Sequence, residues 1–185
     1  MRVTGGTLGG RRYTPPTQPG LRPLTDRLRE SLFNILQHQL ELEGAHVLDV
    51  YAGSGALAWE ALSRGAARVV SVELNRKNLA FMQQTAQTFG VAERHTTLRQ
   101  KAELYLQRAQ DQFHLIFLDP PYKLGNKASL VHTALERELL LPGGLLAMHH
   151  PSQEHYGLLR GFREERKYGG ASISFFTLGS EERAH

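Results

Sequence analysis

Short apolar segments alternate with amphipathic segments between residues 46 and 149, and this alternation constrains the fold more than any other feature of the sequence. Strand-like patterns occur at residues 46–50, 68–73, 96–100, 114–118 and 145–149. Helical spacing predicts helices between them, at residues 56–64, 76–89, 102–109 and 129–140. Because such alternation is typical of a parallel sheet with helices on both faces, the sequence predicts an α/β domain.

The C-terminal segment departs from this alternation. Residues 163–168 and 172–178 have the pattern of two strands on either side of Gly169-Gly170. We therefore expect a mostly parallel, seven-stranded sheet that ends in an antiparallel hairpin, which is unusual in dinucleotide-binding domains. A leading helix is expected to begin near Thr25 and Asp26, both acceptable N-caps, and to continue to Leu40 before Gly44.

The N-terminal segment is basic and rich in glycine and proline. We expect residues 1–24 to form an arm over a single domain of residues 25–185, because 185 residues with 41% hydrophobic content fit one core. Residues 1–36 hold six arginines and two acids, a net charge of +4, whereas the remaining 16 basic and 16 acidic residues cancel. Such an arm suits contact with a phosphate backbone, although a solvated basic surface is the simpler alternative. The arginines expected to contact RNA are Arg11, Arg12, Arg22, Arg27 and Arg29.

Two features that the sequence lacks limit the kinds of site and the location that we expect for this protein. The chain has no cysteine, which excludes disulfides, thiolate zinc sites and a cysteine nucleophile. The first thirty residues contain no continuous apolar run, so we expect neither a signal peptide nor a membrane anchor. We expect a soluble, cytoplasmic protein.

A glycine-containing loop follows the first predicted strand, from Asp49 through Ala52, Gly53, Ser54 and Gly55 into a helix. Its pattern fits a dinucleotide fingerprint, in which an acid at the end of the second strand holds a ribose; Glu73 stands there. Asp49 favours another ligand, because its carboxylate would repel a pyrophosphate and attract the ammonium of a methionine group. We therefore expect S-adenosylmethionine, released as S-adenosylhomocysteine, and not NAD.

A second loop, Asp119-Pro120-Pro121-Tyr122, leaves the fourth predicted strand at the same edge of the sheet. The two prolines stiffen the loop and remove two amide donors. Asp119 and the Pro120 carbonyl could accept both hydrogens of an exocyclic amine, which favours a tetrahedral nitrogen with a lone pair free for attack. Tyr122 offers a flat face for a base. By itself this segment could also be a rigid surface turn, and only its position near Asp49 and Glu73 is specific.

These motifs resemble those of a known family, the bacterial 16S rRNA guanine-N2 methyltransferases that modify guanine 966, which have a Rossmann-like fold. The resemblance covers nearly the whole chain, at residues 5–12, 22–36, 48–57, 60–66, 119–122 and 166–169. It implies that Asp49 and the glycine loop hold the methionine end of the cofactor, Glu73 and Leu74 its ribose side, and Lys101 and Ala102 its adenine. It also implies that residues 119–122 hold the target guanine and that Arg22, Thr25 and Arg27 roof the site or grip RNA.

Two positions depart from the family pattern. Lys101 and His149 stand where the family usually has acids, so we expect altered adenine contacts at Lys101 and infer nothing for His149. His149, His150 and His155 could suggest a metal site, but adjacent residues of a strand point to opposite faces, and we expect no metal.

The expected reaction is methyl transfer from S-adenosylmethionine to the N2 amine of a guanine in 16S rRNA. The expected partner is a small ribosomal subunit or its assembly intermediate, the expected state a monomer. Two alternatives remain: an amino-methyltransferase acting on adenine or cytosine in DNA or another RNA, and an NAD-type dinucleotide-binding protein.

Overall fold

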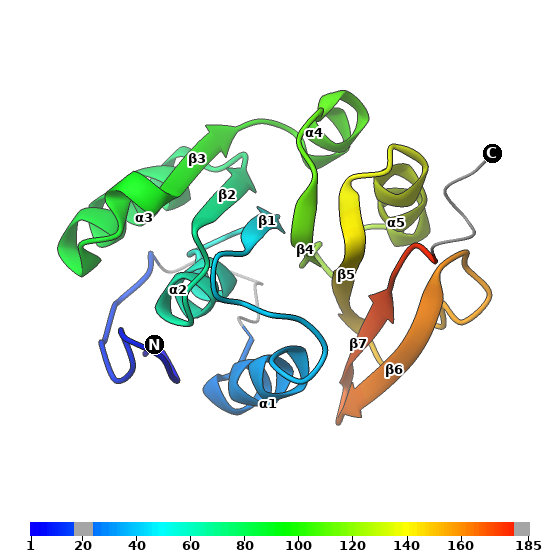
Figure 1. The fold of residues 1–185 in the computed structure, drawn as a ribbon, viewed down its shortest axis with the longest axis horizontal. Coiled ribbons are helices and arrows are strands. Elements are labelled where there is room, and N and C mark those ends of the chain that lie inside the picture. The colour runs from blue at the N-terminus through cyan, green and yellow to red at the C-terminus, as the bar shows by residue number, and fades with distance from the viewer. Residues whose placement is uncertain (17–23, 180–185) are drawn as a thin grey trace.

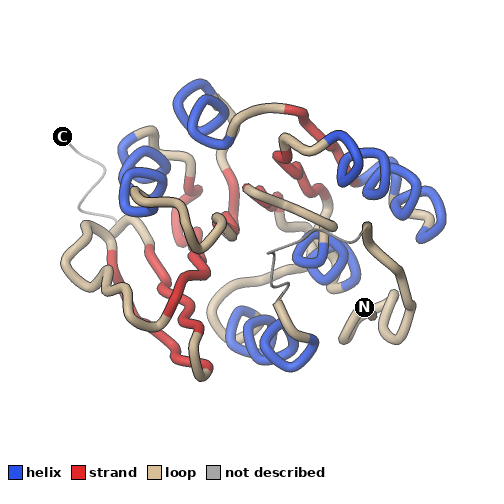
Figure 2. The backbone as a smooth tube through the Cα atoms, turned by 180° about the vertical axis from the view of Figure 1, so that it is seen from behind, coloured by secondary structure: helices blue, strands red, loops and turns tan. Residues whose placement is uncertain are grey.

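The computed structural model describes residues 1–16 and 24–179 and contains one seven-stranded sheet between two layers of helices (Figures 1 and 2). The strand order is β3-β2-β1-β4-β5-β7-β6, with β1 to β5 parallel and β7 antiparallel to β5 and β6. The predicted α/β fold with a C-terminal antiparallel hairpin is confirmed. The strands are β1 (His46–Val50), β2 (Arg68–Glu73), β3 (His95–Arg99), β4 (Phe113–Leu118), β5 (Leu140–Pro151), β6 (Phe162–Tyr168) and β7 (Ala171–Phe176).

Two apolar cores lie on opposite faces of the sheet, because successive side chains of a strand alternate between faces. Val47 of β1 packs in the core beneath α1, α2 and α3, and Leu48 packs in the core beneath α4 and α5. Figure 1 shows these two groups of helices on opposite sides of the sheet. The helices are α1 (Asp26–Leu36), α2 (Ala56–Ser63), α3 (Arg76–Phe89), α4 (Ala102–Arg108) and α5 (Lys127–Glu136), with a 3-10 turn η1 (Ala92–Arg94).

The parallel register brings the ends of three strands together. Asp49 of β1 is paired with Ser71 of β2 and Phe117 of β4. Glu73 is the last residue of β2, and Asp119 directly follows β4. The carboxyl edge of the sheet therefore carries three acids on adjacent strands, where open α/β sheets bind ligands.

The first sixteen residues pack onto the domain. Val3, Leu8 and Tyr13 are buried in the core beneath α1 to α3, and a bridge joins Arg2 to Arg12. The arm is anchored further at Glu60 of α2, which accepts hydrogen bonds from the Thr4 amide at 2.8 Å and the Thr4 hydroxyl at 2.9 Å. The boundary expected after residue 24 adjoins residues 17–23, outside the described residues, and stays a prediction.

Arg29 corrects one of the expected RNA contacts. Its side chain is fully buried, pairs with Asp26 at 2.8 Å and Glu60 at 3.4 Å, and donates to the carbonyls of Leu24 and Arg2. A buried cation is tolerated only with such partners, so Arg29 joins α1, α2 and the arm and has no surface to offer a phosphate.

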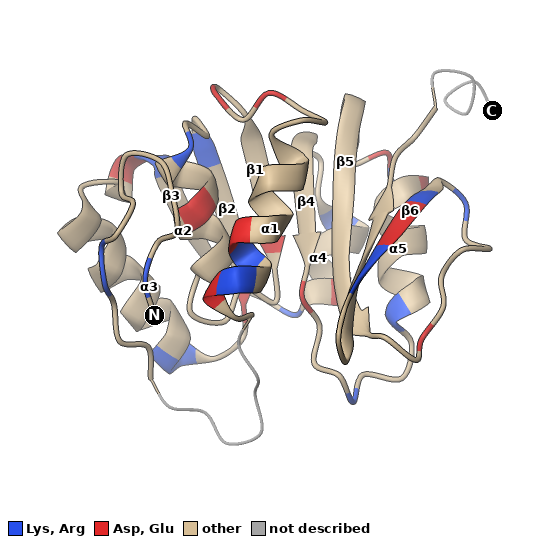
Figure 3. Ribbon diagram, turned by 90° about the horizontal axis from the view of Figure 1, so that it is seen from below, with Lys and Arg blue, Asp and Glu red and all other residues tan. Residues whose placement is uncertain are grey.

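The other arginines expected to bind RNA differ in their surroundings. Arg11, Arg12 and Arg27 are exposed, and α1 presents charges of both signs (Figure 3). Arg11 already donates to the Thr88 carbonyl at 3.3 Å and lies 5.7 Å from the centre of a phenyl ring of α3. Arg22 lies outside the described residues. Arg12 and Arg27 are thus the better candidates for an exposed contact.

Several element boundaries differ from the prediction, most clearly those of the leading helix, of the fifth strand and of α5, which ends at Glu136 and not at residue 140. The leading helix ends at Leu36, and residues 37–40 form turns, with the amides of residues 39 and 40 both bonded to the Leu36 carbonyl. The fifth strand begins at Leu140, earlier than predicted, because the chain passes through the glycine pair at residues 143–144 as a bulge in the pairing with β4.

Candidate active site

The glycine loop leaves β1 in a conformation that only small residues adopt easily. Tyr51, Gly53 and Gly55 all have positive φ, at 62°, 55° and 78°. A Cβ on Gly55 would lie 2.9 Å from the ring of Trp59, so this position also has no room for a side chain. The Trp59 indole donates to the Ser54 carbonyl at 3.0 Å, which fixes the loop to the core.

Tyr51 is a different case, because a residue with a side chain is disfavoured in the left-handed region and is held there only by its surroundings. The hydroxyl of Tyr51 donates to Glu103 at 2.7 Å. Burial and the neighbouring Glu103 carboxylate raise the pKa of Tyr51, so the phenol stays protonated. This contact links the loop after β1 to the start of α4.

Glu73 is held by backbone amides on both sides of its carboxylate. One oxygen accepts from Gly53 at 2.8 Å, and the other accepts from the amides of Leu74 and Asn75, each at 2.8 Å. Because three backbone amides donate to its two oxygens, the carboxylate is fixed in place at the end of β2. Glu73 therefore ties the glycine loop to the neighbouring strand.

Asp49 is the unsatisfied group of the site. It is 1% exposed, and neither carboxylate oxygen makes a hydrogen bond of normal geometry within the described residues. Burial, followed by the charges of Asp119 and Glu73, raises the pKa of Asp49 to about 8, and the nearby Ala58 amide offsets only part of this rise. A buried acid without a partner is costly. The position thus suits a cationic or hydrogen-bond-donating ligand group.

A cleft of about 580 Å³ opens beside these acids. It brings together four of the expected cofactor residues, Glu73, Leu74, Lys101 and Ala102, and the expected catalytic residue Pro121. Asp49 and residues 52–55 of the glycine loop lie outside its lining. The residues of the lining that the sequence did not single out are Tyr51, Val72, Gln100, Glu103, Lys123 and Leu124.

Of these residues, Glu103 could have been recognised from the sequence as a candidate for the cleft. It stands in the first turn of α4, two positions after Lys101, so a carboxylate is present in the cleft although the expected acid is absent at Lys101. Its contact with Tyr51 depends on the turn after β1, which the sequence pattern does not reveal.

The second loop carries Asp119 and Tyr122 on the other side of the edge. Asp119 is partly exposed, at 30% of its side chain, and Tyr122 is 40% exposed. His149 of β5 lies between them: its Nδ1 is 2.7 Å from an Asp119 carboxylate oxygen and its Nε2 is 3.1 Å from the Tyr122 hydroxyl. The sequence around His149 indicates no role for it, because both of its partners come from the loop that follows β4.

A buried lysine holds the backbone of the same loop. The ammonium of Lys127, 2% exposed, donates to the carbonyls of Tyr122 at 2.8 Å and Leu124 at 2.9 Å and pairs with Glu154 at 2.8 Å. The hydroxyl of Tyr156 donates to the same Glu154 carboxylate. This loop is thus fixed by charged, buried contacts as well as by its prolines.

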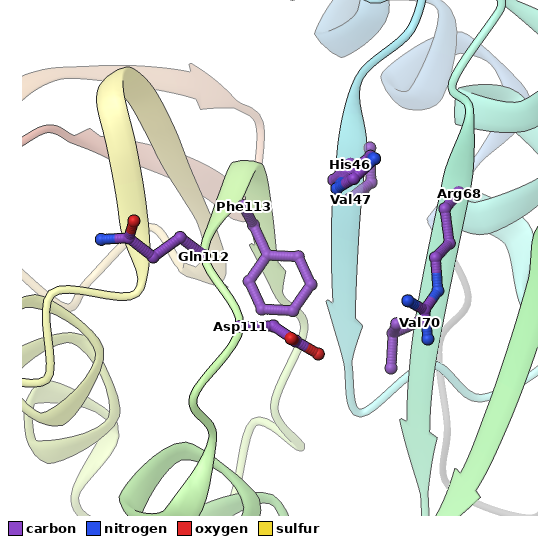
Figure 4. A pocket seen from close by; sticks show the side chains of 7 residues that line it. All are labelled: His46, Val47, Arg68, Val70, Asp111, Gln112 and Phe113. Carbon is purple, nitrogen blue, oxygen red and sulfur yellow. The ribbon is translucent and has the colours of Figure 1, made fainter.

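A smaller cavity of about 130 Å³ lies at the opposite edge of the sheet (Figure 4). His46, Arg68 and Phe113, the first residues of β1, β2 and β4, are part of its lining. Asp49, Glu73 and Asp119 are not among its lining residues. The ligand site of this fold is expected at the carboxyl edge, so the larger cleft is the candidate active site.

The histidines point in different directions. His149 faces Asp119, whereas His150 contacts the Ser174 hydroxyl at 2.8 Å on the other face of the sheet. In residues 1–16 and 24–179, no group of three or more potential ligand side chains could hold a metal ion. Within the same ranges, no helix has both the length and the apolar character needed to cross a membrane.

Comparisons with known proteins agree with this arrangement. The family model described as "Conserved hypothetical protein 95" matches residues 1–177. The ribosomal RNA small subunit methyltransferase D of Escherichia coli is 39% identical over 132 residues, 68% of this chain and 62% of that protein. The enzyme of the same name from Haemophilus influenzae is 34% identical over 152 residues, 79% of this chain and 76% of that protein. The chain thus aligns with less than two thirds of the Escherichia coli relative.

A solved structure resembles the whole domain. The Escherichia coli protein yhhF, provisionally assigned as a methyltransferase, superposes with a TM-score of 0.82 at 28% identity, over 95% of this chain and 96% of that one. The resemblance inferred from the sequence motifs is thereby confirmed at the level of family and fold.

Asp49 generates a prediction about stability and pH. Between about pH 4 and pH 8 the folded protein keeps a proton on Asp49 that the unfolded chain, with a pKa near 3.8, has released. The free energy of unfolding should therefore fall as pH rises through this window, by at most about 1.4 kcal/mol per pH unit from this group. Urea unfolding of wild type and Asp49→Asn, without added cofactor, should give curves that diverge with pH. If the difference between wild type and Asp49→Asn stayed constant with pH, the burial of a protonated Asp49 would be contradicted. Asp111→Asn, which changes an exposed acid, is the control and should show the same pH dependence as wild type.

Proposed function

Because the chain belongs to the conserved hypothetical protein 95 family, and its relatives include named ribosomal RNA methyltransferases, we propose that it is an S-adenosylmethionine-dependent methyltransferase. Its proposed target is the exocyclic N2 amine of a guanine in 16S rRNA. The observation that carries the proposal is Asp49, a fully buried acid with two unpartnered oxygens beside a glycine loop. An ammonium group satisfies such a carboxylate, and a pyrophosphate does not, which disfavours an NAD-type ligand.

The residues of the edge fit the proposed cofactor in three parts. Asp49 and the loop Ala52, Gly53, Ser54 and Gly55 would hold the methionine end. Glu73 would hold the ribose hydroxyls, because an ionised carboxylate offers several lone pairs and no donor. Leu74, Lys101 and Ala102 line the cleft where the adenine would lie. The Lys101 side chain cannot accept a hydrogen bond from the adenine amine, but the backbone amide of Ala102 could still donate to the adenine ring.

The cofactor supplies an electrophilic methyl group on a sulfonium, so the protein has to position an amine and receive its hydrogens. Asp119 and the Pro120 carbonyl would accept the two N–H groups, which leaves the nitrogen lone pair directed at the methyl carbon. The N–C bond forms as the C–S bond breaks, and the methylated nitrogen then releases one proton toward Asp119. Pro121 keeps the loop stiff, and Tyr122 would stack against the base.

An rRNA substrate is supported by the names of the relatives and by the exposed arginines near the arm. Arg12 and Arg27 would contact phosphates, with Arg11 held nearer to the protein surface and Arg22 in the segment outside the described residues. We further propose that the enzyme acts as a cytoplasmic monomer on a small ribosomal subunit or its assembly intermediate. Methylation of adenine or cytosine in DNA or another RNA is the alternative for the same amine-binding loop.

Asp119 provides the test of the reaction. We expect Asp119→Ala to abolish transfer of a tritiated methyl group to small ribosomal subunits, because the amine loses its acceptor, while S-adenosylhomocysteine binding by calorimetry largely survives. Asp111→Ala, an exposed acid at the opposite edge, serves as the control with full activity. Turnover retained by Asp119→Ala would remove this residue from the mechanism, and absence of cofactor binding by wild type would refute the proposed function.

The basic surface provides a second test. The double variant Arg12→Ala, Arg27→Ala should bind rRNA more weakly, and the slope of its log–log salt dependence should flatten by about 0.7–0.9 for each phosphate that the protein no longer neutralises. Filter binding at several salt concentrations measures the slope. Arg108→Ala, an exposed arginine at the end of α4 on the other layer, should leave the slope unchanged. An equal slope in all three proteins would mean that the arginines near the arm do not contact RNA.

A further inference from the structure

The imidazole of His149 joins the two side chains that the proposed reaction needs to orient. Its Nδ1 lies 2.7 Å from an oxygen of Asp119, and its Nε2 lies 3.1 Å from the hydroxyl of Tyr122. The ring planes of His149 and Tyr122 are tilted by 52°, with centroids 5.4 Å apart. Only 8% of the His149 side chain is exposed, so both contacts are shielded from water. One ring therefore connects the acceptor of the amine with the aromatic face for the base.

The strand holds this ring in place. His149 belongs to β5, which is paired with β4 on one side and with β7 on the other. Within β5, His149 is paired with Ile173 of β7. The next residue, His150, points to the opposite face and is fixed there by the Ser174 hydroxyl. Pairing of β5 with β4 up to Met148, and with β7 through His149 itself, fixes the backbone that carries the imidazole at the sheet edge.

The chemistry of the contacts determines the direction of each hydrogen bond. A carboxylate can only accept, so Nδ1 carries the hydrogen that is donated to Asp119. In the neutral ring Nε2 is then an acceptor, and the Tyr122 hydroxyl donates to it. One oxygen of Asp119 is thereby occupied, and the other is left for the amine. The phenol of Tyr122 is held at its hydroxyl, which fixes the direction of the long axis of its ring.

We infer that His149 is a positioning residue, which sets the angle between the Asp119 carboxylate and the Tyr122 ring so that the target amine meets both. This inference rests on the proposed function. It concerns a residue that stands where the family pattern has an acid, and an ionised acid could not donate to Asp119.

The loop itself does not depend on His149. Lys127 fixes its backbone through the carbonyls of Tyr122 and Leu124, and Lys127 is in turn paired with Glu154. Loss of His149 should therefore leave the loop backbone in position and remove one hydrogen bond from each of the two side chains. Both ring nitrogens of His149 contact the loop proposed to bind the amine and not the residues proposed to hold the cofactor, so cofactor affinity should not change. The effect should lie mainly in kcat, since a small misplacement of reacting groups can reduce the rate by about 100-fold.

Two amide substitutions separate the contacts of the ring. The amide nitrogen of asparagine is the same number of bonds from Cβ as Nδ1, and that of glutamine is the same number as Nε2. His149→Asn keeps a donor for Asp119 and loses the contact with Tyr122, so we expect a smaller fall in kcat than in His149→Gln. His149→Gln loses that donor, so we expect kcat to fall about 10- to 100-fold with KM for small ribosomal subunits within about twofold of wild type. His132→Asn, an exposed histidine of α5, is the matched control.

The measurements are single-substrate kinetics, S-adenosylhomocysteine affinity by calorimetry and thermal unfolding of each variant. Long-range proton–nitrogen NMR of the wild-type imidazole gives a readout that is independent of turnover, and the Nδ1–H tautomer is expected. A hydrogen on Nε2 and not on Nδ1 would overturn the inference, even if both variants failed to fold. Equal kcat for wild type, His149→Asn and His149→Gln would also overturn it while leaving the proposed function intact. If wild type neither binds S-adenosylhomocysteine nor transfers a methyl group, the proposed function fails and the inference fails with it.

Discussion

The convergence of three carboxylates at one edge of a parallel sheet is the constraint on which the site depends. Parallel pairing of β1 with β2 and β4 makes Asp49, Glu73 and Asp119 neighbours, and like charges disfavour one another. The fold accommodates each acid differently. Glu73 is satisfied by backbone amides and Asp119 by His149, whereas Asp49 is left buried without a partner among the described residues. Asp49 is therefore the acid of the three that a cationic ligand group would satisfy in the proposed function.

A second buried acid organises the packing of the N-terminal segment onto the domain. Glu60 of α2 is fully buried and gathers Thr4 of the arm, Arg29 of α1 and Arg64 of its own helix around one carboxylate. The first residues of the chain are consequently part of the folded domain, with Val3, Leu8 and Tyr13 in its core. A basic N-terminal segment in this protein is therefore an anchored surface from which only some arginines can reach a nucleic acid.

The fold and the three acids could be predicted because strand and helix periods determine which residues end adjacent parallel strands. What could not be predicted depended on contacts between distant elements. Arg29 has the pattern of a surface arginine, and only the meeting of α1, α2 and the arm explains its burial. The contacts of His149 likewise come from β4 and the loop after it. The end of α5 could not be recognised from a glycine, because the residue that closes the helix in the left-handed conformation, at φ 52°, is Glu138.

In the proposed function, Asp49 belongs to the cofactor site, Asp119 belongs to the loop that binds the amine, and guanine is the base that this loop receives. Nucleoside analysis tests this assignment most directly. Small ribosomal subunits lacking the modification would be incubated with the protein and S-adenosylmethionine carrying a labelled methyl group, digested, and resolved by mass spectrometry. We expect the label in N2-methylguanosine. Label in a methylated adenosine or cytidine, or no label in either the subunits or naked rRNA, would contradict it.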